Sequence, residues 1–138
     1  WMRRAASTEL PEAQFKYGTM LLHGEGVQED EAEGMRLITS AAEQGFSEAQ
    51  FVLGGMYNVG DRVPVDNRAA ADFFAQAAEQ GHPWAQYSLG VMLSLGEGVE
   101  EDLEKSQHWL RCAAAQGLLE AQARCRRELL LPEGSSTA

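Results

Sequence analysis

The sequence predicts an all-α protein, a right-handed α/α solenoid of three 36-residue helix-turn-helix repeats with a partial repeat at each end. The prediction rests on residues that recur every 36 positions. The recurring sets are Ala13, Ala49, Ala85 and Ala121; Gly18, Gly54 and Gly90; and Gly45, Gly81 and Gly117. A fixed period of about 20 to 50 residues is typical of arrays of small units, each of which buries its apolar face only against a neighbour.

The repeats align without insertion or deletion as residues 12–47, 48–83 and 84–119. Partial units are expected at 1–11 and 120–131, and residues 132–138, with Pro132 and Gly134, read as a disordered tail. The chain begins at Trp1, in register with Trp109 and inside a repeat. We therefore expect further repeats of the same protein upstream.

The first helix of each unit is predicted from apolar residues with the spacing of one helical face. In the second unit these are Ala49, Leu53, Met56 and Tyr57. Ser47, with Gln50 three residues later, fits a capping box, and Pro11 and Pro83 suit the first turn of their helices. Glycine inside a helix costs about 1 kcal/mol relative to alanine, so the Gly18, Gly54 and Gly90 position indicates a close approach by another helix.

A glycine-containing turn and a second helix complete each unit. The turn is clearest at Gly96-Glu97-Gly98-Val99, whereas Arg62 replaces the second turn glycine in the middle unit. Asp30, Asp66 and Asp102 stand where the second helix should begin and are predicted N-caps. This helix carries large apolar residues, then a pair of alanines, and should end before Gly45, Gly81 or Gly117.

The strings AQFVLGGMYNVG, AQYSLGVMLSLGEGV and AAEQG resemble the Sel1-like repeat, a relative of the tetratricopeptide repeat. The resemblance runs from Trp1 to about Leu131. It implies a non-catalytic interaction module, an adaptor or scaffold, that binds a protein or peptide partner on the concave face lined by the first helices. The alternative is a dedicated inhibitor of a bacterial effector enzyme, like the immunity proteins that some bacterial members resemble. No targeting signal is visible, so the compartment, bacterial periplasm or cytoplasm, stays open.

Candidate partner-binding residues lie on one side of the first helices. They are Phe15, Thr19 and Leu22 in the first unit, Phe51, Gly55 and Asn58 in the second, and Trp84, Tyr87, Val91 and Ser94 in the third. The recurring aromatic position serves either inter-repeat packing or partner contact. Trp84 is the most informative candidate because its equivalents are glutamates, and it too could pack locally instead. Gly55 beside Phe51 predicts a shallow pocket.

Charged residues gather at two places. The turns should stack into an acidic edge formed by Glu25, Glu29, Asp61, Glu97 and Glu101. This edge is either simply solvated or a docking site for a basic segment. Arg111, Arg124 and Arg127 crowd the other end, as the polar outside of a terminal capping helix or as an anion contact.

Several classes of function are excluded or disfavoured. A net charge of −10 argues against nucleic acid as a partner, and no apolar stretch approaches the roughly 20 residues of a membrane span. His23, His82 and His108 occupy three different repeat positions, and His108 with Cys112 makes at most half of a zinc site. Cys125 is expected on the buried stripe and Cys112 outside it. Catalytic motifs are missing, so we expect no enzyme, no cofactor and no metal.

Overall fold

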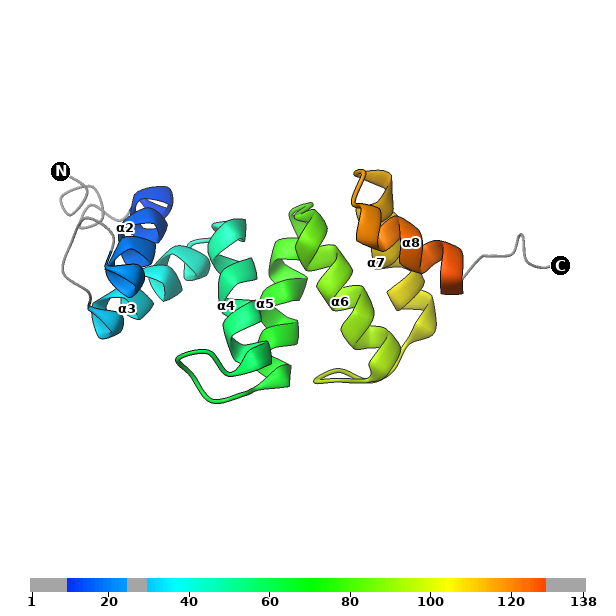
Figure 1. Cartoon of the computed structure of the whole chain (residues 1–138), viewed down its shortest axis with the longest axis horizontal. Helices are drawn as coiled ribbons and strands as arrows, with labels where there is room; N and C mark the ends of the chain where they lie inside the picture. Colours follow the sequence, from blue (N-terminus) through cyan, green and yellow to red (C-terminus); the bar gives the residue numbers. More distant parts are fainter. Residues whose placement is uncertain (1–9, 25–29, 129–138) are drawn as a thin grey trace, which may run out of the picture.

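The computed structural model describes residues 10–24 and 30–128, which form seven helices and no strand. Three antiparallel pairs follow one another along the long axis of the molecule (Figure 1). The pairs are α2 (Pro11–His23) with α3 (Glu31–Glu43), α4 (Ser47–Val59) with α5 (Asn67–Glu79), and α6 (Pro83–Leu95) with α7 (Leu103–Ala115); α8 (Leu119–Glu128) comes last. This confirms the all-α solenoid of three repeats. The predicted tail at 132–138 and nearly all of the partial unit at 1–11 lie outside the described residues.

The second helix of every unit begins and ends where the sequence predicts. The side chains of Asp30, Asp66 and Asp102 each accept a hydrogen bond from the backbone N–H three residues later, at 3.1 Å. At the other end Gly45 adopts φ +96°, and Phe46 donates its N–H to the Ala41 carbonyl. This left-handed residue after the helix satisfies carbonyl groups that would otherwise lack a partner.

The predicted capping box at Ser47 is wrong. Helix α4 begins at Ser47 with Phe46 as its N-cap, and no side chain caps it. Gln50 is only 3% exposed, and its amide group is engaged inside the protein. Its Nε2 donates to the Ala42 carbonyl at 3.1 Å, while its Oε1 accepts from Gln80 Nε2 at 2.8 Å. A buried amide must find such partners, so Gln50 is not available to the helix terminus.

Gln50 is one member of a repeated hydrogen-bond network, which we call the glutamine network. Gln86 in the third unit donates to Ala78 O at 3.2 Å and accepts from Gln116 Nε2 at 2.9 Å. Each buried glutamine therefore joins its own first helix to the second helices of the preceding unit and of its own unit. The network fixes how successive units are placed on one another.

Alanines and glycines bring the two helices of a unit close together. Ala49, Ala70 and Ala77 are fully buried. A Cβ atom added at Gly54 would lie 2.7 Å from two ring carbons of Phe74, a side chain that is 4% exposed in the core between α4, α5 and α6. The predicted close approach at this glycine position is confirmed.

The turn of the middle unit keeps its shape although Arg62 replaces glycine. Arg62 adopts φ +69°, close to the +73° of Gly98 at the equivalent position. Its guanidinium lies 3.1 Å from the Asp61 carboxylate and 3.6 Å from that of Glu31, in the preceding unit. A Cβ atom at Gly98, in contrast, would collide with the carbonyl of Asn67. Arginine is thus tolerated at one turn and excluded at the next.

Two adjacent glycines in α4 should respond oppositely to alanine. Gly54→Ala should lower the free energy of unfolding by about 1 to 3 kcal/mol, because the new methyl group overlaps the Phe74 ring. Gly55→Ala should raise it by up to about 1 kcal/mol, because nothing lies within 4 Å of its added Cβ and only the helix propensity changes. Urea unfolding followed by circular dichroism measures both. Equal effects from the two variants would contradict the close contact.

The glutamine network should contribute measurably to stability. Gln50→Leu should cost about 1 to 3 kcal/mol of unfolding free energy, because Gln80 loses its acceptor and Ala42 O loses a donor. Glu79→Leu is the control on the exposed face of α5 and should change stability by less than about 0.5 kcal/mol. Chemical denaturation of the two variants tests this, and a loss for Gln50→Leu no larger than the control's would show that the network is dispensable.

Candidate functional site

An apolar hollow lies between the end of α2 and α4; we call it the α4 hollow. Its volume is about 340 Å³. It is lined by His23, Phe51, Val52, Gly55, Met56, Val59, Asp61 and Arg62. Apolar side chains of α4 form most of the lining, and charged side chains of the following turn stand at its border. The sequence predicts a shallow pocket at Gly55 and Phe51, and both residues line this hollow.

Phe51 is held in place by α5 and by the residue that precedes α6. Its ring stacks on the imidazole of His82 with 4.6 Å between the ring centroids, and it also contacts Phe74 at 5.7 Å. Phe15 is placed similarly, with its ring 5.5 Å from that of Phe46, which occupies the repeat position of His82. Phe15 and Phe51 thus pack against the end of their own units, beside core clusters that extend into the following first helix, while remaining half-buried.

His82 is a residue whose role the sequence reasoning missed. Its Nδ1 accepts a hydrogen bond from the Ala85 N–H at 3.2 Å and so caps α6. Because Nδ1 is the acceptor, the neutral ring carries its proton on Nε2, which donates to the Glu48 carboxylate at 3.0 Å. The detectable signal is the polar residue at a position where the other units have Phe46 and Leu118.

Trp84 and Tyr87 form a second aromatic feature one turn apart on α6. The indole of Trp84 is 40% exposed and meets the Tyr87 ring edge to face, with 5.9 Å between centroids. A large aromatic side chain exposed to this extent is available for contact with another molecule. The local contact with Tyr87 orients the indole.

The small and polar candidates are engaged mostly with their own helices. Thr19 donates its hydroxyl to the Phe15 carbonyl at 2.8 Å, and Ser94 donates to Val91 O at 2.8 Å. The amide of Asn58 lies 3.3 Å from the Asn67 side chain. Val91 is half-buried. These residues line the surface of the first helices without converging on one point.

Leu22 does not belong on this surface, which corrects the sequence-based assignment. Its side chain is 2% exposed and packs in the core cluster that contains Ile38. The physical reason is Gly34, where an added Cβ would lie only 3.0 Å from the Leu22 side chain. Without a Cβ there, the core has room for leucine.

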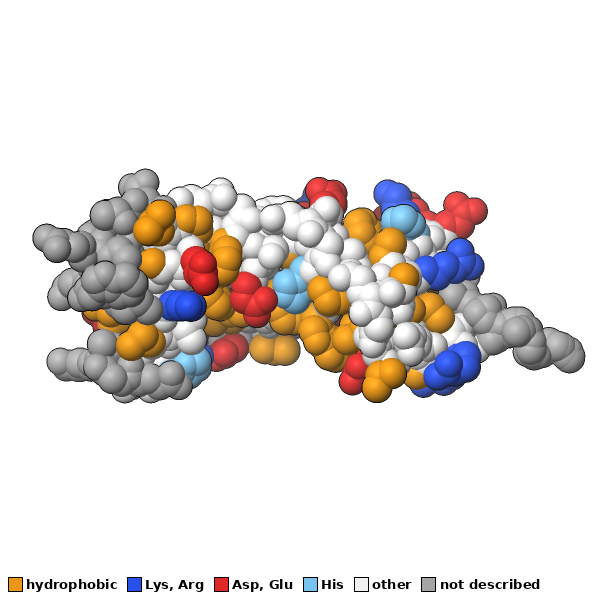
Figure 2. Space-filling view, turned by 90° about the horizontal axis from the view of Figure 1, so that it is seen from above, with side chains coloured by type: hydrophobic (Ala, Val, Ile, Leu, Met, Phe, Trp, Pro, Cys, Tyr) orange, Lys and Arg blue, Asp and Glu red, His pale blue; other side chains and the backbone are white. Residues whose placement is uncertain are grey.

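The described part of the predicted acidic edge contains basic and apolar groups as well. Asp61, Glu97 and Glu101 are exposed, whereas Glu25 and Glu29 lie outside the described residues. Arg62 pairs with Asp61, and Val59 and Leu95 are exposed at the same end of their helices. At the C-terminal end Arg111, Arg126 and Arg127 are exposed, and Figure 2 shows Lys and Arg side chains gathered there.

The cysteines and histidines do not assemble a metal site in the residues that the structure describes. Cys112 Sγ lies 3.8 Å from His108 Nε2, and neither Cys112 nor Cys125 forms a disulfide among the described residues. Cys125 is half-buried instead of fully buried, because α8 has no further described unit packed on it. Within residues 10–24 and 30–128, no helix combines the length and the apolar character required to cross a bilayer.

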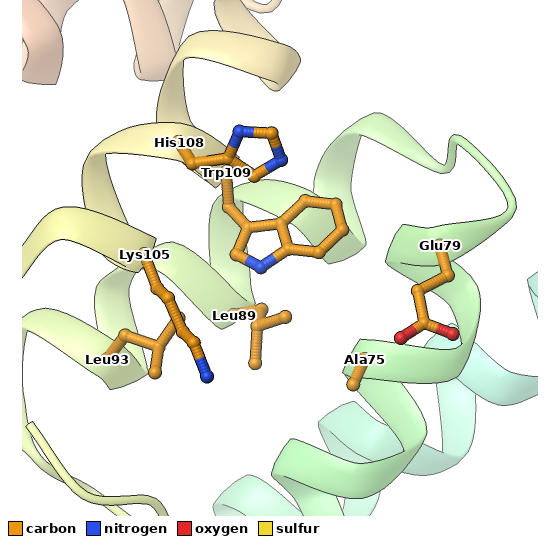
Figure 3. A pocket seen from close by; sticks show the side chains of 7 residues that line it. All are labelled: Ala75, Glu79, Leu89, Leu93, Lys105, His108 and Trp109. Atoms are coloured by element: carbon orange, nitrogen blue, oxygen red, sulfur yellow. The ribbon is translucent and has the colours of Figure 1, made fainter. Parts of the chain in front are cut away.

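A second hollow, on the side of the second helices, has no counterpart among the predicted sites. It has a volume of about 410 Å³ and opens between α5 and α7 above α6 (Figure 3). Its lining residues are Ala75, Glu79, Leu89, Leu93, Lys105, His108 and Trp109. We call it the α7 hollow.

Comparison with known proteins places the chain among repeat proteins. The profile of the Sel1 repeat matches residues 11–46, 47–82 and 85–118. A Sel1 repeat protein from Oxalobacter formigenes has a similar crystal structure, with 34% identity, a TM-score of 0.89, and coverage of 91% of this chain and 95% of that one.

Two further structures are similar. A protective antigen present in uropathogenic Escherichia coli strains is 35% identical with a TM-score of 0.86; 91% of this chain aligns with 27% of that longer one. Cysteine-rich protein B of Helicobacter pylori shares the fold at 20% identity, with a TM-score of 0.69 and coverage of 89% and 93%. No protein with a curated description is significantly similar in sequence.

Replacing Trp84 tests whether this indole is a surface or a core group. Trp84→Ala should lower Tm by no more than about 5 °C, because the side chain is substantially exposed and loses chiefly its contact with Tyr87. Phe74→Ala, the buried comparison, should cost about 3 to 5 kcal/mol. Differential scanning calorimetry measures both. A loss for Trp84→Ala as large as that for Phe74→Ala would assign Trp84 to the core.

Proposed function

Because the chain belongs to the Sel1 repeat family, whose members are generally protein-interaction modules, we propose that it binds a peptide or protein partner on the concave face lined by α2, α4 and α6. The module would act without chemistry of its own, as an adaptor or scaffold. The partner would lie across first helices from more than one unit.

The α4 hollow is the observation that supports this proposal most directly. Its lining includes Phe51, Val52 and Met56, and Gly55 leaves open space above the helix. An apolar side chain of the partner would lose contact with water here, at roughly 25 cal/mol per Å² of apolar surface buried. Asp61 and the Arg62 guanidinium at the border offer polar groups to the partner backbone.

The exposed indole of Trp84 supports a second contact on α6. Tryptophan and tyrosine are the residues most enriched at the energetic centres of protein interfaces, because they bury a large area while fixing few torsions. Trp84 and Tyr87 together present such a surface. Of the acidic edge, Asp61, Glu97 and Glu101 stay predicted contacts for a basic segment of the partner, whose affinity would then fall with salt.

Filling the α4 hollow should weaken partner binding without unfolding the chain. In cells that naturally produce the protein, a photo-crosslinking amino acid at position 55 should capture the partner, which mass spectrometry identifies. With purified partner, Gly55→Trp should weaken binding at least about tenfold in calorimetry, because the indole occupies the space that the partner needs. A partner that is an enzyme and loses its activity on binding would make this chain a dedicated inhibitor.

Ala32→Trp is the control for this experiment. It places the same indole on the exposed surface of α3, away from the α4 hollow, and should leave the affinity unchanged. If both variants bound the partner as well as the original chain does, the first helices would not be the binding surface.

A further inference from the structure

The α7 hollow lies where the third unit departs from the second at two packed positions. In the second unit the Tyr57 ring stacks on Phe73, with 5.9 Å between the centroids and an interplanar angle of 10°. Leu93 and Trp109 stand at the same two positions in the third unit. Leucine is smaller than tyrosine and cannot cover the indole. The space beside Trp109 therefore stays open, with Leu89 and Leu93 as its floor.

The open space is apolar in the middle and charged at its two sides. Trp109 closes it on the α7 side, as Figure 3 shows, and Ala75 lies across from the indole on α5. The carboxylate of Glu79 approaches from α5, and the ammonium group of Lys105 approaches from α7. Both side chains are exposed, and neither forms an ion pair within the described part of the chain.

The charge arrangement is particular to this unit. The corresponding place between α3 and α5 has only one of the two charges. Glu43 stands at the repeat position of Glu79, but Ala69 stands at that of Lys105. Two opposite charges held apart by an apolar hollow can select both the chemistry of a bound segment and its direction, since a reversed segment would place like charges together.

We propose that the α7 hollow is a second docking site, for a protein segment with a large apolar side chain between a basic and an acidic residue. The apolar side chain would lie against Trp109 above Leu89 and Leu93. The basic residue would pair with Glu79 and the acidic residue with Lys105. The site is lined by α5, α6 and α7, whereas α2, α4 and the turn after α4 line the α4 hollow, and it does not rest on the function proposed above.

Short synthetic peptides test the site directly. Two peptides with blocked termini carry a central phenylalanine in a glycine-serine chain. In the first peptide lysine precedes the phenylalanine and glutamate follows it. In the second peptide glutamate precedes it and lysine follows it. The readout is the indole N–H resonance of Trp109, assigned through Trp109→Phe. One peptide should move this resonance and bind at least about fivefold more tightly than the other.

Two variants separate docking from incidental contact. The Glu79→Lys/Lys105→Glu double variant should reverse the preference between the peptides. The Leu93→Tyr/Trp109→Phe double variant recreates the Tyr57 and Phe73 pair, so it should fold and lose at least about tenfold in affinity, measured by calorimetry. Gly55→Trp, which fills the α4 hollow, should change neither result. A failure of the proposal for the α4 hollow can therefore be told apart from a failure of the proposal for the α7 hollow.

Several results would overturn the proposal. One is a Trp109 resonance that neither peptide moves. Others are a preference that survives the charge exchange, and a filled hollow that binds as tightly as the open one. A resonance that shifts with protein concentration alone would identify a second copy of the chain as the occupant and would equally reject a heterologous segment.

Discussion

The buried glutamine that begins each unit is the group on which the arrangement of the solenoid depends. Gln50 and Gln86 each connect three consecutive helices through one amide, which donates to the unit before and accepts from its own second helix. Leaving a buried hydrogen-bonding group without a partner costs free energy. If two units slid or rotated relative to one another, the buried glutamine at each repeat would lose its hydrogen bonds and that cost would be incurred. Apolar packing alone has no such directional requirement.

Small residues give both close contact between helices and an open surface on α4. The core uses alanine and glycine where helices touch, and Phe74 fills the space against Gly54. One residue further along α4, Gly55 faces outward and leaves the α4 hollow open. Adjacent glycines in one helix thus serve packing on one side and a candidate binding surface on the other, because neighbouring residues are about 100° apart around a helix.

Individual features of the surface lie where the units differ in sequence. His82 replaces an apolar residue and joins Phe51, Glu48 and the start of α6 into one local arrangement. Leu93 in place of tyrosine opens the α7 hollow beside Trp109. A repeat protein can carry such changes independently in each unit, because every unit contacts only its neighbours.

The 36-residue period determined the helices, their order and the solenoid, because small recurring residues mark helix contacts and chain reversals that every unit requires. It also placed the Asp66 cap, which depends on a hydrogen bond three residues along the chain, and the gap beside Gly55 that its missing side chain leaves on α4. Only the tertiary structure decided the direction of Gln50, which looked like a capping residue, and the burial of Leu22, which depends on the absence of a side chain at Gly34. The α7 hollow, too, required three helices to be placed together. In these cases the deciding contact joins different helices, and local sequence carries no measure of the space between them.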